Sequence, residues 1–225
     1  MSDAQFLSAA QFATYSDAWL ELLQQPTPAA LQQCFAAPTP NQLLWNVSFP
    51  IQRIVQLVSV VGGRTIRARF VVLPGEPTPQ FSLVLYVTNA TGTRLSAYYL
   101  AERTPEPTIL QDQVPHALVS TWLHNWQKTT HVDASLFQTL EGPLQGYNFE
   151  LADFMDPLFQ AQPFTSQQLR LYFGLHEFYS AAPGTEEKLT QTFGLVLRIY
   201  ATNPEEGGSS DAPIYDVSMP CPPTC

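Results

Sequence analysis

The stretch Thr65-Ile-Arg-Ala-Arg-Phe-Val-Val-Leu73 has a counterpart 103 residues later, Gln168-Leu-Arg-Leu-Tyr-Phe-Gly-Leu-His176. In both stretches apolar residues recur at every second position, a period that predicts a β-strand with one face in the core. Each stretch is followed by a second apolar run, Phe81–Val87 and Phe193–Ile199, and the loop before this run is longer in the second copy. Two β-hairpins built on one pattern therefore decide the fold.

The segments before the hairpins follow the same repeat. Trp19–Gln24 recurs 103 residues later as Trp122–Gln127, with Trp, Leu and Gln at matching positions. Apolar residues at helical spacing predict helices over 4–25, 28–35, 116–128 and 134–140. Two further helices are predicted, one capped by Ser48 with Pro50 in its first turn and continuing to Val58, and one capped by Asp153. Short extended segments are predicted at 43–47, 94–100 and 147–149.

The repeat also predicts how the halves combine. Two strands alone bury too little surface to be stable, so the hairpins are expected to meet, edge to edge or face to face, with helices over their apolar faces. The predicted fold class is α+β: an internal duplication in which each half has helices followed by an antiparallel hairpin, forming one pseudo-twofold domain. The first repeat spans 1–107, the second spans 108–203, and an irregular tail rich in Pro, Gly and Ser spans 204–225.

The composition is unusually poor in charge. Charged residues make up 13% of the chain, against about 25% in typical soluble domains, and lysine occurs only at Lys128 and Lys188. Lysine is depleted at protein–protein contacts, and a surface with few charges carries little electrostatic penalty for association. This predicts a homo-oligomer or a protein partner. The alternative is a bias of habitat or lineage toward uncharged polar residues.

The net charge excludes several classes of partner. The chain carries a formal net charge of −9, and its arginines are spread along the sequence rather than clustered. Nucleic acid and anionic membrane surfaces both require a basic patch, so neither is predicted as a partner. No run approaches 18 apolar residues, and the start Met-Ser-Asp-Ala-Gln-Phe lacks the features of a signal peptide. A cytoplasmic protein without membrane insertion is expected.

A set of motifs in the second half points to a family. Leu169-Arg-Leu-Tyr-Phe-Gly-Leu175, Phe193-Gly-Leu-Val-Leu197 and the tail Pro220-Cys-Pro-Pro-Thr-Cys225 together resemble a family of uncharacterised small bacterial proteins. Those proteins share an Arg-x-Tyr-Phe-Gly-Leu-like strand and a terminal Cys-Pro-Pro-x-Cys. The resemblance covers roughly residues 116–225, and the first half departs from it with Arg69 in place of the Tyr. It implies a bacterial protein and brings no activity to this chain.

The second hairpin carries the best candidate binding residues. Alternation sends Arg170, Tyr172 and His176 to one face, and the partner strand adds Arg198 and Tyr200 if the register puts them on the same side. Arginine forks match a carboxylate or phosphate, and tyrosine supplies a directional donor, so this face is a candidate anion site. The alternative is a face exposed to solvent or covered by a helix, with ordinary cross-strand contacts.

The first hairpin keeps only part of this set. Arg67 stands at the position of Arg170, whereas the other positions are taken by Leu73, Tyr86 and Thr88. The shared arginine suggests a structural role, and the differences direct the binding hypothesis to the second half.

The terminal cysteines are the other specific feature. Cys221 and Cys225 are candidates for a local disulfide or an intermolecular cross-link, ahead of a reduced pair. A zinc site ranks third, because its four ligands would have to include Cys34 and a histidine at no recognisable spacing.

No catalytic motif stands out. Ser180 takes the position of the second histidine in what would be His-Glu-x-x-His, and neither a phosphate-binding glycine loop nor a Gly-x-Ser-x-Gly elbow is present. The sequence therefore favours a non-enzymatic interaction or self-assembly protein with no catalytic residue, metal or cofactor. The alternative is a binder, or an enzyme, of a small anionic ligand at the second hairpin.

Overall fold

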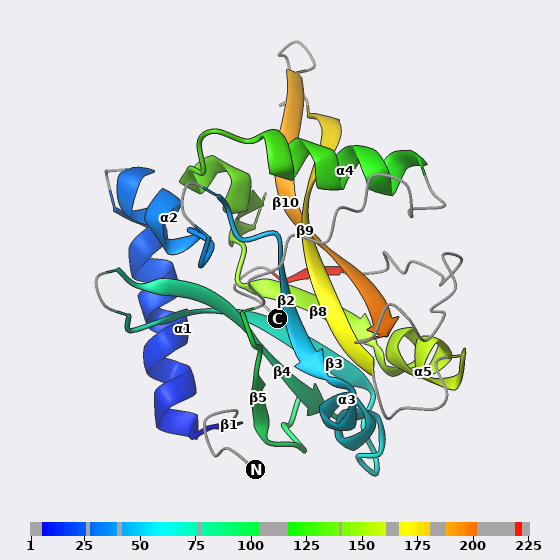
Figure 1. The fold of residues 1–225 in the computed structure, drawn as a ribbon. Helices are drawn as coiled ribbons and strands as arrows, with labels where there is room; N and C mark the ends of the chain where they lie inside the picture. Colours follow the sequence, from blue (N-terminus) through cyan, green and yellow to red (C-terminus); the bar gives the residue numbers. More distant parts are fainter. Residues whose placement is uncertain are drawn as a thin grey trace.

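The computed structural model describes residues 6–25, 28–39, 42–75, 78–103, 117–139, 141–160, 167–180, 188–201 and 219–221. Helices and strands are mixed along these stretches, and the protein has the α+β fold that the sequence predicts (Figure 1). The helices are α1 (Ala9–Leu23), α2 (Pro28–Cys34), α3 (Ile51–Val58), α4 (Ala117–Lys128) and α5 (Leu151–Gln160), with a short 3-10 helix, η2, at Ala134–Phe137.

Two antiparallel sheets contain most of the strands. The larger has the order β1 (Phe6–Leu7), β5 (Tyr98–Leu100), β4 (Gln80–Thr88), β3 (Thr65–Leu73), β8 (Gly146–Glu150) and β11 (Met219–Cys221). The smaller has the order β10 (Lys188–Ala201), β9 (Gln167–Ser180) and β2 (Asn46–Pro50). A separate short pair joins β6 (Gln138–Thr139) and β7 (Gly142–Pro143).

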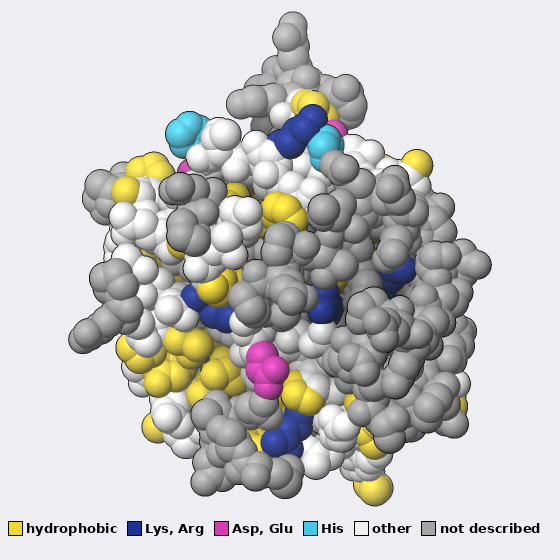
Figure 2. All heavy atoms as spheres, in the orientation of Figure 1, with side chains coloured by type: hydrophobic (Ala, Val, Ile, Leu, Met, Phe, Trp, Pro, Cys, Tyr) yellow, Lys and Arg dark blue, Asp and Glu magenta, His cyan; other side chains and the backbone are white. Residues whose placement is uncertain are grey.

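The surface reflects the low charge of the sequence. On the face drawn in Figure 2, most of the coloured and white side chains are uncharged, and a group of apolar side chains gathers on the side where α1 lies. Lysine and arginine side chains are scattered from the upper to the lower part of this face rather than joined in one basic patch.

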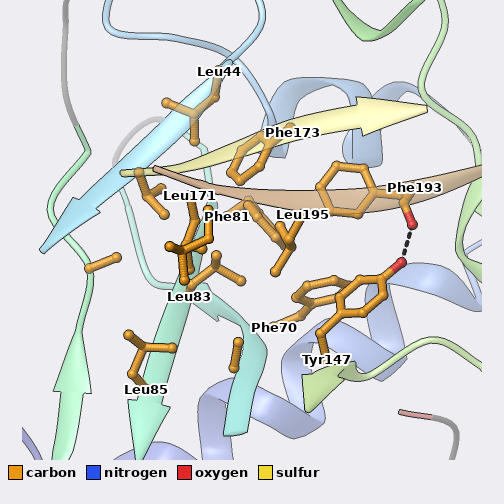
Figure 3. Packing of buried hydrophobic residues seen from close by; sticks show 14 of the residues in the cluster. Leu44, Phe70, Phe81, Leu83, Leu85, Tyr147, Leu171, Phe173, Phe193 and Leu195 are labelled. Carbon is orange, nitrogen blue, oxygen red and sulfur yellow. Dashed lines mark hydrogen bonds between the residues drawn. The ribbon is translucent and has the colours of Figure 1, made fainter. Parts of the chain in front are cut away.

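An aromatic core fills the space between the two sheets. Phe70 and Phe81 on β3 and β4 face Phe173 and Phe193 on β9 and β10, and all four rings are almost fully buried. The ring centroids of Phe70 and Phe193 are 5.5 Å apart, as are those of Phe81 and Phe173. Figure 3 shows side chains of the two hairpins pointing toward one another, with the Tyr147 hydroxyl donating to the Phe193 carbonyl oxygen. The hairpins therefore meet face to face, one of the two arrangements that the sequence leaves open.

A long helix lies on the outer face of each sheet. The α1 helix joins an apolar cluster on the larger sheet that includes Phe12, Tyr15, Val71, Val84 and Tyr86. The α4 helix joins a second cluster on the smaller sheet: Val119, Leu123, Tyr172 and Val196, with Trp122 at its edge. Because successive residues of a strand point to opposite faces, both clusters are separate from the central core. The layers are α1, larger sheet, smaller sheet and α4, and α3 packs against α5 beside them.

Each outer helix carries, in its second half, a tryptophan that enters the core. Trp19 Nε1 in α1 donates to the carbonyl oxygen of Leu144 at 2.9 Å, and Trp126 Nε1 in α4 donates to the carbonyl oxygen of Leu44 at 2.9 Å. Both indoles are buried. Each helix is thus hydrogen-bonded to a loop from the opposite half of the chain.

The short strands β2 and β8 also cross between the halves. β2 lies before residue 104 but pairs with β9, and β8 lies after residue 116 but pairs with β3. Residue by residue, the β2–β9 ladder matches the β8–β3 ladder: Asn46 pairs with Tyr172 as Gly146 pairs with Arg69. The adjoining hydrogen bonds match too, from Phe173 N to Trp45 O at 2.8 Å and from Phe70 N to Gln145 O at 3.0 Å.

The two hairpin ladders correspond in the same way. Phe70 lies opposite Leu83 in the first hairpin, and Phe173 lies opposite Leu195 in the second. Both pairs occupy the positions that the sequence repeat makes equivalent. The registers of the two hairpins therefore agree with the repeat.

The two tryptophans that the sequence repeat aligns, Trp19 and Trp122, lie in different surroundings. Trp126 rather than Trp122 resembles Trp19, because both indoles donate to a loop carbonyl oxygen and pack on a core phenylalanine. Trp122 lies on the outer face of the smaller sheet. Trp122 and Trp126 are one helical turn apart and so lie on nearly the same helix face.

Several predicted boundaries change. Residues 4–25 do not form one helix: Phe6–Leu7 form β1, and Ser8 begins α1 with a capping box in which its side chain accepts from Gln11 N. In the stretch 204–225, expected to be irregular, Met219–Cys221 form β11 on β8, and the rest lies outside the described residues.

We expect Trp19→Phe and Trp126→Phe each to lower the free energy of unfolding by about 1–3 kcal/mol, because each leaves a buried carbonyl oxygen without its donor. Trp122→Phe is the control and should cost less, since its indole is only half-buried. Urea denaturation followed by far-UV circular dichroism measures all three. A greater loss of unfolding free energy for Trp122→Phe than for Trp126→Phe would contradict the core position assigned to Trp126.

Candidate functional site

The register of β9 and β10 brings the predicted binding residues to one face. Arg198 lies directly opposite Arg170, so both side chains point to the outer face of the smaller sheet together with Tyr172 and His176. Tyr200 is opposite Gln168 in the same ladder, but its side chain lies outside the described part of the structure.

The two arginines form a buried cationic row. Arg170 is 7% exposed and Arg198 is 3% exposed. Arg170 Nη1 is 3.5 Å from the Tyr172 hydroxyl. With the Gln168 amide oriented so that both of its polar atoms are satisfied, its oxygen accepts from Arg170 Nη2 at 2.6 Å and from Nε at 3.0 Å. On the other side of Arg170, β2 contributes the buried Ser48. Arg198 lies opposite Arg170 in the ladder, and two arginine forks on one face suit a carboxylate or phosphate.

Helix α4 covers the next part of this face. Leu123 of α4 packs with Tyr172 and Val196, all of them buried. A Cβ atom on Gly174 would lie 3.2 Å from the Cβ atom of Trp122, so this glycine lets the helix approach the strand. Tyr172 therefore packs against a helix rather than lining an open cleft.

The His176 side chain packs as a neutral aromatic ring and not as a charged group. Its imidazole stacks on the Trp122 indole, with ring centroids 3.9 Å apart and an angle of 17° between the planes. On β10 it lies against Gly194, where a Cβ atom would come 2.2 Å from its Nε2 atom. Burial lowers the pKa of His176 from 6.5 to about 4, so the ring is neutral at pH 7.

The larger sheet also has a buried arginine, which the sequence did not single out as a binding residue. Arg69 is 7% exposed, and its Nη1 atom donates to Asn148 Oδ1 at 3.2 Å. Burial lowers the pKa of Arg69 to about 10, although nearby Tyr86 partly offsets this. The partner Asn148 comes from β8, in the opposite half of the chain, so no local pattern could have identified this contact.

The cysteines do not assemble a site among the described residues. Cys34 is fully buried, and burial raises the pKa of its thiol to about 12, which leaves it unreactive. The backbone of Cys221 pairs with Gly146, whereas Cys225 lies outside the described residues, so the disulfide between them stays a prediction. In the stretches that the structure describes, no three His, Cys, Asp or Glu side chains come together as around a metal ion.

One hollow lies away from all of the predicted residues. It has a volume of about 420 Å³ and lies where β3 begins and where β8 passes into α5, lined by Gly63–Thr65 and Phe149–Ala152. Nearby, Asp153 accepts a hydrogen bond from Glu150 N at 2.8 Å, and partial burial raises the pKa of Asp153. Sequence reasoning missed this hollow because its two walls come from opposite halves of the chain.

Comparisons with protein-family models, with curated proteins and with solved structures find no match to this chain. The resemblance of the second half to a bacterial family therefore stays a prediction. None of the described helices is both long and apolar enough to cross a membrane.

We expect stability to fall as the pH is lowered from about 6.5 to 4. In this range the unfolded chain binds a proton at His176, whereas the folded protein does not until its lower pKa is reached. The free energy of unfolding should drop by roughly 1–3 kcal/mol through this group. His176→Leu, which introduces the residue that Leu73 provides at the equivalent position of the first hairpin, should reduce that drop. Urea denaturation at a series of pH values measures it.

The exposed His131 gives a matched control. His131→Leu should keep the pH dependence of the wild-type protein. An unchanged slope in His176→Leu would mean that His176 is not the group responsible.

Proposed function

We propose that this chain is a non-catalytic interaction protein, an internally duplicated α+β scaffold that associates with further copies of itself. The observation that carries this proposal is the reciprocal pairing of β2 with β9 and of β8 with β3 in one register. Two halves that exchange equivalent strands are related as the subunits of a symmetric dimer are related. The first repeat, 1–107, and the second, 108–203, are then two copies of one binding unit.

Equivalent contacts extend beyond the strands. Leu44 N donates to Phe35 O at 2.7 Å, and Leu144 N donates to Phe137 O at 2.7 Å. The Phe35 and Phe137 rings stack on each other, with centroids 5.5 Å apart. These matched pairs support a pseudo-twofold relation between the halves and a surface evolved to bind a copy of itself.

The composition of the surface supports further association. The chain has few charged residues, and several large apolar side chains are well exposed, among them Phe159 at 68% and Leu118 at 50%. Contacts between such surfaces depend on apolar burial more than on charge.

We expect size-exclusion chromatography with light scattering to resolve a species of at least twice 25.1 kDa in protein folded and kept at a concentration of about 100 µM or more. The mass should be similar in about 0.1 M and 1 M NaCl, because salt screens charge contacts and leaves apolar ones intact. A mass of 25.1 kDa at every concentration and both salt levels would count against self-association.

A second candidate function is favoured by the arginine row. Arg170 and Arg198 lie opposite each other, both more than nine-tenths buried, and Gln168 and Tyr172 hold Arg170 in place. Such a pair suits a carboxylate or phosphate group, which two arginine forks bind well. This supports binding of a small anion at the second hairpin.

We expect inorganic phosphate or citrate, at about ten times its dissociation constant, to raise the melting temperature by roughly 3–6 °C. Arg198→Tyr should abolish this rise. The variant is expected to fold because Tyr86 already pairs with Arg67 at the equivalent place of the first hairpin.

Arg94→Ala is the matched control, since Arg94 is exposed in an isolated β-bridge with Thr88, far along the chain from the arginine row. Its melting temperature should rise with the anion as in the wild-type protein. Loss of the rise in Arg94→Ala, or its survival in Arg198→Tyr, would show that the anion binds elsewhere.

A further inference from the structure

We propose that copies of this chain associate by exchanging halves, so that the first half of one copy pairs with the second half of another. This proposal rests on the proposed self-association and states how it is achieved. The partner is a second copy of the chain, and the surface that it covers is the one each half already offers to the other.

The contacts between the halves are of a kind that a second copy can supply. They comprise the β2–β9 and β3–β8 ladders and the hydrogen bonds from Trp19 to Leu144 and from Trp126 to Leu44. Each contact joins a segment before residue 104 to a segment after residue 116. None of them depends on both segments belonging to one chain.

Neither half buries its own core. Phe70 and Phe81 of the first hairpin are covered in part by Phe173 and Phe193 of the second, and the covering is mutual. The first hairpin also needs β8 along the free edge of β3, and the second needs β2 along β9. A half that folds before its own partner is available therefore presents an apolar face and an unpaired strand edge, which a neighbouring copy fits.

The protein concentration during folding decides whether the halves of one chain pair with each other or with those of another copy. The halves of one chain, being covalently joined, meet at an effective concentration of about a millimolar, and the exchanged dimer gains none of the described contacts beyond those of the monomer. Exchange is therefore favoured when chains fold close together, and it persists afterwards because reversal requires the core to open. The dimer fraction should depend on the concentration during folding rather than during measurement.

The pair Thr65 and Glu150 offers a direct test. Thr65 on β3 lies opposite Glu150 on β8, and the bonds from Phe70 N to Gln145 O and from Leu151 N to Arg64 O set this pair between hydrogen-bonded ones. Its Cα atoms are then about 4.5 Å apart, a distance that a disulfide can span. Thr65 is half-buried and Glu150 is exposed, so cysteine is tolerable at both positions.

The experiment uses full-length protein carrying Cys221→Ser and Cys225→Ser. Thr65→Cys protein and Glu150→Cys protein are unfolded, mixed, refolded together at about 500 µM and oxidised, then compared with the same mixture refolded at about 5 µM. The higher value approaches the effective concentration of about a millimolar, and the lower lies far below it. Exchange predicts a disulfide-linked dimer containing one chain of each kind on a non-reducing gel, at least tenfold more abundant at the higher concentration.

Three controls establish whether a disulfide-linked dimer reports the exchange of halves. The double variant Thr65→Cys/Glu150→Cys, refolded dilute, should close an internal disulfide, which establishes that the geometry is correct. The two single variants mixed after folding should give no linked dimer, and neither should Val61→Cys with Glu150→Cys, because Val61 is 95% exposed and is not in the ladder.

The outcomes separate the two proposals. Oligomers by light scattering without any linked dimer, while the double variant closes internally, would overturn exchange and leave self-association through another surface. A monomer under every condition would overturn both.

Discussion

The burial of aromatic rings between two facing hairpins is the constraint on which the rest of this structure depends. Phe70 and Phe81 on one side and Phe173 and Phe193 on the other lie in one continuous core, which the tryptophans of α1 and α4 help to close. The elements that hold the hairpins together join opposite halves of the chain: a short strand along one edge, and a tryptophan bonded to a distant loop. The molecule is thus stabilised by contacts between its halves as much as within them.

The outer faces of the two sheets do not pack against each other, and there the two halves of the chain differ. At equivalent positions the larger sheet has Tyr86 where the smaller has Arg198, and Leu73 where the smaller has His176. The first face has apolar and aromatic packing with the buried Arg69 beside it, whereas the second combines the apolar contacts of α4 with a stacked histidine and a row of arginines. Since the inner faces must stay complementary, the outer faces are where a new property can arise at low cost in stability.

Much of the fold follows from the sequence, because strand alternation is a local signal. Both hairpins form where the alternation predicts them, and Arg170, Tyr172, His176 and Arg198 do share one face. The crossed partners of β2 and β8 are not predictable, since strands this short contain no information about which distant edge they join. The sequence leaves open whether a ligand or a helix lies over Tyr172, because Gly174 fits either, and the approach of Trp122 to 3.2 Å decides for the helix.

The pairing of β2 with β9 and of β8 with β3 also affects how the chain folds during its synthesis. β2 ends at Pro50 and its partner β9 begins at Gln167, so more than half of the chain must still be synthesised before the two can pair. At roughly 5–20 residues per second, translation takes about 6–25 s to supply that partner. From the completion of β4 at Thr88, the nascent chain carries a hairpin whose β3 edge has no partner until β8 is made and whose phenylalanines await β9 and β10. The rate of translation therefore sets how long these surfaces remain uncovered.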